Sequence, residues 1–261
     1  MALSRTSPSV GPQSPDVTGF YDKPTGSIQY LVSDPQTRKA AIIDAVMGFD
    51  PASATTDSSG VEHILRYAET ERLEIEWILD THPHADHLLA SHWLKQRLGK
   101  PNAIGAKVKE IAELWRGLYN MPDAFDPEAD FNHLFEDGDT FQIGTLPVRV
   151  MLSPGHTLGS ITYVVGDDAA FVHDTFMQPD AGTSRADFPA VQLTCCTTRC
   201  RISLPCPTPR ASLSGMITAP PTGASQPGNP PCRNSAATTS TSVAACPETL
   251  TSRNAPRVTR P

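Results

Sequence analysis

The order of apolar and polar positions along the chain predicts strands interleaved with helices. Ile28, Tyr30 and Val32 recur at every second position and 40–44 is a short apolar run, so these segments predict a β-hairpin. After a polar loop at 48–60, apolar residues recur at helical spacing. Helical spacing of apolar residues predicts helices at 61–68, 90–98 and 108–115. Short apolar or alternating segments predict strands at 75–79, 103–105 and 148–152 and a hairpin at 161–172. This alternation is typical of a layered α/β domain.

One short stretch, Thr81–His87, contains four side chains of types that bind metal ions: His82, His84, Asp86 and His87. It lies between the strand predicted at 75–79 and the helix predicted at 90–98. A tight connection between two regular elements is a rigid place from which side chains can point into one cavity. The stretch therefore predicts a metal site, whereas a lone histidine in a loop would not.

Two more candidate ligands lie at the ends of later predicted strands. Pro154 and Gly155 break the strand ladder directly before His156, and Asp174 follows the second strand of the hairpin at 161–172. Residues at the ends of neighbouring strands can meet in one cavity. We therefore expect His156 and Asp174 to join the cluster at Thr81–His87.

Charge and composition exclude several classes of function. Lys and Arg number 21 against 28 Asp and Glu, a net charge of −7 that argues against a nucleic-acid surface. No apolar run is long enough for a membrane span. Residues 1–16 are rich in Ser and Pro without an apolar run, so we expect a disordered leader rather than a signal peptide, and a cytoplasmic location.

The composition changes abruptly near residue 190. All eight histidines and every aromatic residue precede this point, whereas all six cysteines follow it. From Ala190 to the end, Glu248 is the single acidic residue against seven arginines, and the segment has no Lys. The two parts of the chain therefore need separate interpretations.

The candidate ligands stand in motifs that resemble those of the metallo-β-lactamase superfamily: Thr81–His87, Pro154-Gly155-His156-Thr157 and Asp174-Thr175. The resemblance covers about residues 17–189. It implies an αββα sandwich, an α/β fold with the metal site along one edge of its two sheets. Ala85, the Gly138-Asp139 turn and Gly182–Phe188 resemble the persulfide dioxygenase branch, which is close to glyoxalase II.

The resemblance to persulfide dioxygenases implies one Fe(II) held by His82, His156 and Asp174. Two histidines and one carboxylate on one face leave open positions for a thiolate and O₂. In this interpretation His84, Asp86 and His87 orient ligands and bound water, with Asp86 as the candidate catalytic residue. By analogy with the branch, Arg185 faces the carboxylates of a glutathione substrate.

The resemblance to glyoxalase II implies a different chemistry, a two-zinc thioester hydrolase. One metal takes His82, His84 and His156, and the other takes Asp86, His87 and a late histidine, with Asp174 bridging the two. A hydroxide activated by the metals attacks the thioester carbonyl. A third alternative is an inactive metal-binding protein, because this chain lacks the late histidine.

The chain departs from the family pattern at His173, where many members have Gly, at Leu158, where they have Pro, and throughout 190–261. Reading the codons of 215–218 one nucleotide earlier permits Gly-His-Asp-Tyr, the family sequence with the late histidine. The same shift at 189–191 permits Gly-Gly. We interpret 190–261 as the product of a frameshift that leaves the sandwich incomplete in its C-terminal half.

The cysteines offer no better interpretation of this tail. Cys195, Cys196, Cys200 and Cys206 lack the paired spacing of a zinc module, and a cytosolic setting disfavours disulfides. An evolved Pro-, Ser- and Thr-rich tail remains an alternative. Either origin predicts a disordered segment at 190–261, because such a composition buries little apolar surface.

Overall fold

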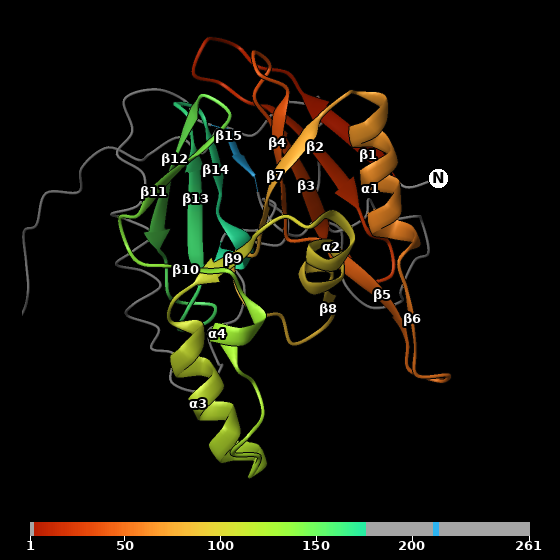
Figure 1. The fold of residues 1–261 in the computed structure, drawn as a ribbon, viewed down its shortest axis with the longest axis vertical. Helices are drawn as coiled ribbons and strands as arrows, with labels where there is room; N and C mark the ends of the chain where they lie inside the picture. The colour runs from red at the N-terminus through yellow and green to blue at the C-terminus, as the bar shows by residue number, and fades with distance from the viewer. Residues whose placement is uncertain (1–2, 176–210, 214–261) are drawn as a thin grey trace, which may run out of the picture.

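The protein, seen in a computed structural model that describes residues 3–175 and 211–213, is built around two β-sheets (Figure 1). The first sheet has seven strands in the order β1-β2-β3-β4-β7-β9-β10. They are β1 (Leu3–Ser7), β2 (Asp16–Tyr21), β3 (Ile28–Ser33), β4 (Lys39–Ile43), β7 (Glu74–Leu79), β9 (Asn102–Gly105) and β10 (His133–Phe135). β4, β7 and β9 are parallel neighbours, so their carboxyl ends lie at one edge of the sheet.

The second sheet has the strand order β11-β12-β13-β14-β15. Its strands are β11 (Thr140–Ile143), β12 (Leu146–Leu152), β13 (Ile161–Val165), β14 (Ala169–Phe171) and β15 (Ala211–Leu213). A single turn of 3₁₀-helix at His173–Thr175 follows β14. A small third sheet has the order β6-β5-β8, formed by β6 (Thr55–Asp57), β5 (Val46–Asp50) and β8 (Leu88–Leu89).

The main core lies between the two large sheets. It contains Val32 and Ile43 from the first sheet and Val148 and Tyr163 from the second, all 3% exposed or less. A second core joins the opposite face of the first sheet to α1 (Ser59–Thr70) and α2 (Ser91–Leu98). The mixed α/β class predicted from the sequence is confirmed, with layers α-β-β among the described residues.

Two further helices extend from the end of the first sheet (Figure 1). These are α3 (Val108–Tyr119) and the short α4 (Pro127–Asp130), whose first turn is capped by the Asp126 side chain. α3 ends at Asn120, which adopts φ +52°, a left-handed conformation that Asn tolerates better than most residues. No helix among the described residues has the length and apolar character needed to cross a membrane.

The structure corrects two predictions drawn from composition and leaves a third untested. The sequence predicts disorder at 1–16, yet β1 pairs antiparallel with β2. The side chains of β1 are exposed, so this strand has no alternation of apolar and polar residues that would reveal it in the sequence. The predicted loop at 48–60 contains most of the β5–β6 hairpin. Of the tail predicted to be disordered, the structure describes β15, which pairs parallel with β14. Residues 190–210 and 214–261 lie outside the described residues, so disorder of the tail stays a prediction.

Candidate metal centre

His82 lies in the loop that follows β7 and is fully buried, with 0% exposure. The loop is hydrogen-bonded to the second sheet at two points. The backbone N of Ile161 donates to the Thr81 carbonyl at 3.0 Å, and the Tyr163 hydroxyl donates to the Asp80 carbonyl at 3.0 Å. These bonds fix the start of the ligand loop against β13.

A chain of hydrogen bonds orients the imidazole of His82. The carboxylate of Asp44 accepts from the Thr81 backbone N at 2.7 Å and from the Thr81 hydroxyl at 2.8 Å. Because the Thr81 hydroxyl donates its proton to Asp44, its oxygen acts as the acceptor in the 2.9 Å hydrogen bond with Nδ1 of His82. This assignment places the proton on Nδ1 and leaves the lone pair of Nε2 for a metal ion.

The second sheet supplies His156 after β12 and Asp174 in the turn after β14. Oδ2 of Asp174 lies 3.4 Å from Nε2 of His156 and 3.7 Å from Nε2 of His82. The three side chains are buried and each offers a ligand atom, all within 4.8 Å of one another. Residues from both sheets thus converge on a volume that one metal ion can occupy.

His84, Asp86 and His87 form a second group of the same kind, also within 4.8 Å. The ring centroids of His84 and His87 are 4.0 Å apart, and those of His84 and His82 are 3.9 Å apart. Nδ1 of His87 lies 3.5 Å from Oδ1 of Asp86, whose side chain is 51% exposed. The second group therefore lies directly beside the first and reaches toward solvent.

Several buried nitrogen atoms of these groups have no hydrogen-bond partner among the described residues: Nε2 of His82, Nε2 of His84 and both ring nitrogens of His87. A buried polar atom without a partner costs roughly 1–3 kcal/mol in protein mutational data. Nitrogen lone pairs that converge with carboxylates are the ligands that zinc and non-haem iron take in proteins. The residues present therefore fit a divalent metal ion.

The electrostatics of the cluster suit a cation. Burial and the neighbouring imidazoles lower the pKa of His84 and of His87, so both rings are neutral and keep a lone pair near neutral pH. Burial raises the pKa of the Asp174 carboxyl, but the surrounding imidazoles, His82 foremost, outweigh it and hold that pKa well below its usual range. A neutral-histidine, ionised-aspartate set is the protonation state that metal binding requires.

The structure also explains the unusual residue before Asp174. His173 adopts φ +45°, in the left-handed region that favours glycine, and histidine is among the side chains that enter it more readily than most. Its Nε2 lies 3.0 Å from the Ser153 hydroxyl, and its side chain is buried. His173 therefore keeps the turn that a glycine would otherwise make.

The structure brings together six of the seven site residues predicted from the sequence: His82, His84, Asp86, His87, His156 and Asp174. The seventh, Arg185, lies outside the described residues. Sequence reasoning missed the orienting role of Asp44 and Thr81. The sequence places Asp44 at the end of the strand predicted at 40–44. Only the structure shows that this strand runs parallel beside the strand at 75–79, so that both end at the same edge of the sheet.

Comparisons with known proteins match this architecture. A family model described as the metallo-β-lactamase superfamily matches residues 24–189. The β-lactamase hydrolase-like protein of Xylella fastidiosa strain Temecula1 is 54% identical over 177 residues, which are 68% of this chain and 41% of that protein. The chain therefore spans less than half the length of this relative.

Two relatives of lower sequence identity have names that state an enzymatic activity. The mitochondrial persulfide dioxygenase ETHE1 of Bos taurus is 28% identical over 160 residues, 61% of this chain and 51% of that protein. The hydroxyacylglutathione hydrolase of Rhodopseudomonas palustris is 31% identical over 163 residues, 60% and 51% respectively. The crystal structure of ETHE1 from Myxococcus xanthus superimposes with a TM-score of 0.58 at 26% identity, covering 77% of this chain and 75% of that one.

Proposed function

The chain belongs to the metallo-β-lactamase superfamily, a superfamily of metal-dependent enzymes, and from this premise we propose that it is a mononuclear non-haem iron dioxygenase. In this proposal His82, His156 and Asp174 hold one Fe(II). The proposed substrate is a persulfide of a small thiol, as the name of the persulfide dioxygenase relative suggests. Glutathione is the proposed carrier, because it is named in the hydroxyacylglutathione hydrolase relative. Arg185 is proposed to face the carboxylates of that carrier.

The observation that carries the proposal is the division of the ligands into two groups. His82, His156 and Asp174 form one complete set of two histidines and one carboxylate, and His84 belongs to the other set. A two-histidine, one-carboxylate face is typical of iron enzymes that bind a substrate and O₂ side by side. A zinc hydrolase would instead hold its first metal with His82, His84 and His156.

When bound, Fe(II) would supply the open coordination positions at which a thiolate and O₂ meet. The chain's own residues prepare this meeting. Asp44 and Thr81 hold His82 with Nε2 directed into the site, which fixes the tautomer and limits ring rotation. Asp86 is proposed to exchange protons between the site and water, which its exposed position beside His87 supports. The overall reaction balances as persulfide plus O₂ plus water giving thiol plus sulfite plus two protons.

The second candidate function is a zinc-dependent thioester hydrolase. The specific observation in its favour is the short distance between the two groups, because the rings of His82 and His84 are only 3.9 Å apart. Adjacent groups of this kind can hold two metal ions that together activate a water molecule. The relationship to a hydroxyacylglutathione hydrolase supports the same chemistry.

The two functions are separated by metal content and oxygen consumption. The full chain, purified without exposure to chelators, should contain about one iron ion per molecule, as expected for a facial triad. It should consume O₂ when glutathione persulfide is added. Two zinc ions per chain, with hydrolysis of S-lactoylglutathione and no oxygen uptake, would establish the hydrolase. Bound metal with neither activity would identify an inactive metal-binding protein.

A further inference from the structure

A cavity of about 430 Å³ lies beside the metal centre, under α3. Val108, Ile111, Ala112 and Trp115 of α3 form one wall. The segment that leads through α4 to Phe131 forms the opposite wall, and α3 and α4 lie together in Figure 1. This volume is within the range of about 300–1,000 Å³ that is typical of ligand pockets.

The cavity is continuous with the candidate ligands. Its inner end is lined by Pro83, His84 and Ala85 from the first ligand loop and by Thr157 and Leu158, which directly follow His156. A sulfur atom bound at the centre would therefore have its organic group directed along this wall. The cavity is thus placed to contact the part of a substrate that does not react.

The wall of the cavity is apolar and offers no cation. Its ionisable side chains are His84, Tyr119 and Asp130, and neither Lys nor Arg belongs to the lining formed by the described residues. The carboxylates of a peptide thiol would find no positive partner here, and Asp130 would repel them. An alkyl or aryl group would instead exchange water for contact with Ile111, Trp115 and Phe131.

We propose that this cavity binds an apolar alkyl or aryl group attached to the sulfur of the substrate. The proposal rests on the proposed function, because that function places the sulfur at His82, His156 and Asp174. It adds a substrate class beside glutathione persulfide: sulfur compounds whose apolar organic group enters the cavity, with an affinity that rises with the apolar area buried there. A polar carrier such as glutathione lies outside the cavity.

The test measures binding rather than turnover. Butane-, hexane- and octanesulfonate are titrated calorimetrically into the full chain, both after chelation and after loading with Fe(II). Each added methylene should increase affinity about fourfold, the ratio expected from burial of one CH₂. An affinity that does not depend on chain length would overturn the proposal.

Variants within α3 locate the binding site. Ala112→Phe fills the cavity and should abolish the dependence on chain length, whereas Leu118→Phe, on the same helix but 57% exposed and outside the lining, should retain it. If Ala112→Phe does not fold, as judged by circular dichroism, Trp115→Ala enlarges the cavity and should shift the preference to longer chains. Unchanged chain-length dependence in the folded cavity variants would overturn the proposal.

The proposal and the proposed function fail in different ways. Chain-length dependence in a protein that binds two zinc ions and consumes no oxygen would refute the dioxygenase and keep the cavity. Oxygen uptake with glutathione persulfide, together with affinities independent of chain length, would keep the dioxygenase and refute the cavity. The chelated protein gives the binding result without reference to either metal.

Discussion

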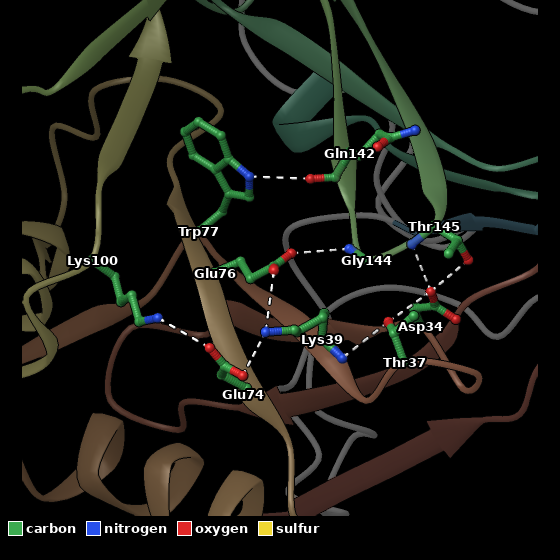
Figure 2. A network of polar contacts seen from close by, with 10 residues as sticks. All are labelled: Asp34, Thr37, Lys39, Glu74, Glu76, Trp77, Lys100, Gln142, Gly144 and Thr145. Carbon is green, nitrogen blue, oxygen red and sulfur yellow. Dashed lines mark hydrogen bonds and ion pairs between the residues drawn. The ribbon is translucent and has the colours of Figure 1, made fainter.

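The carboxylate of Asp34 accepts hydrogen bonds from both the backbone N and the hydroxyl of Thr145, each at 2.7 Å (Figure 2). Asp34 lies in the turn between β3 and β4 of the first sheet, and Thr145 lies between β11 and β12 of the second. Asp34 also accepts from the Thr37 hydroxyl at 2.8 Å. The two sheets are therefore joined at the edge opposite the ligand loops.

The first prediction concerns Asp34→Asn. Burial raises the pKa of Asp34, but the hydrogen bonds from Thr145, Gln36 and Thr37 outweigh it and lower that pKa from 3.8 to about 2. The carboxylate therefore stabilises the fold above the unfolded-state pKa, and this contribution is lost as pH falls from about 4 toward 2. Asp34→Asn should lower the free energy of unfolding by about 1–3 kcal/mol at pH 7.

Urea denaturation at several pH values checks this prediction. The difference between the parent chain and Asp34→Asn should be largest at neutral pH and should shrink below about pH 4. Asp123→Asn, at an exposed position in the loop after α3, serves as the matched control and should change stability little. A constant difference across the whole pH range would contradict the role given to the Asp34 carboxylate.

The second prediction concerns Gly144, which adopts φ +60° beside Thr145. Its backbone N donates to Glu76 at 3.0 Å (Figure 2). A Cβ at this position would lie 2.6 Å from Oδ2 of Asp34 and closer still to the Thr37 hydroxyl. Gly144→Ala should therefore destabilise the fold by at least about 1–3 kcal/mol through backbone strain and steric overlap.

Thermal unfolding measures the effect of Gly144→Ala. Gly138→Ala is an informative comparison, because Gly138 also has a positive φ, +92°, but a Cβ there meets no atom within 4 Å. The Gly138 variant should report backbone strain alone. Equal losses for the two variants would show that contact with Asp34 and Thr37 contributes nothing.

The third prediction concerns the orientation of His82. Thr81→Val keeps the shape of the side chain but removes the hydroxyl that links Asp44 to Nδ1 of His82. Metal affinity should fall by about 10- to 100-fold, the usual effect of losing such a supporting hydrogen bond. Thr81→Ser retains the hydroxyl and should retain most of the affinity. Competition with a chromophoric chelator measures both constants, and equal affinities would refute the orienting role.

The fourth prediction separates the two groups of candidate ligands. His82→Ala, His156→Ala and Asp174→Ala should each abolish metal binding, because each removes one member of the three-residue set. His84→Ala should retain bound metal at reduced affinity. Elemental analysis of the purified variants gives the answer. Loss of metal from His84→Ala as complete as from His82→Ala would exclude the mononuclear site.

The fifth prediction concerns the reading frame. If residues from about 190 onward arise from a frameshift, resequencing the gene around codon 189 should reveal one inserted or deleted nucleotide. The corrected frame should encode Gly-His-Asp-Tyr at 215–218. An unchanged gene sequence would contradict the frameshift and establish the Pro-, Ser- and Thr-rich segment as natural sequence.

The sequence indicated the candidate ligands that the structure brings together, because each is marked by local order. Thr81–His87 is contiguous, and His156 follows a Pro-Gly pair that ends a strand. The role of Asp44 could not be predicted, because it depends on β4 and β7 being parallel neighbours. Such a long-range pairing leaves no local signal in the sequence. β1 was missed because an exposed strand is held by backbone hydrogen bonds and has no apolar period. The cavity under α3 depends on the packing of side chains, which periodicity does not reveal.

Because the candidate ligands come from both sheets, a metal ion bound at this centre would also cross-link the two sheets. His82 extends from the first sheet, and His156 and Asp174 extend from the second. An ion that binds all three binds the folded chain and not the unfolded one, so saturation at 100 times the dissociation constant adds about 2.7 kcal/mol of stability. The supply of metal would then determine how much of this protein survives proteolysis, and the metal-loaded fraction and the abundance of the protein would rise together.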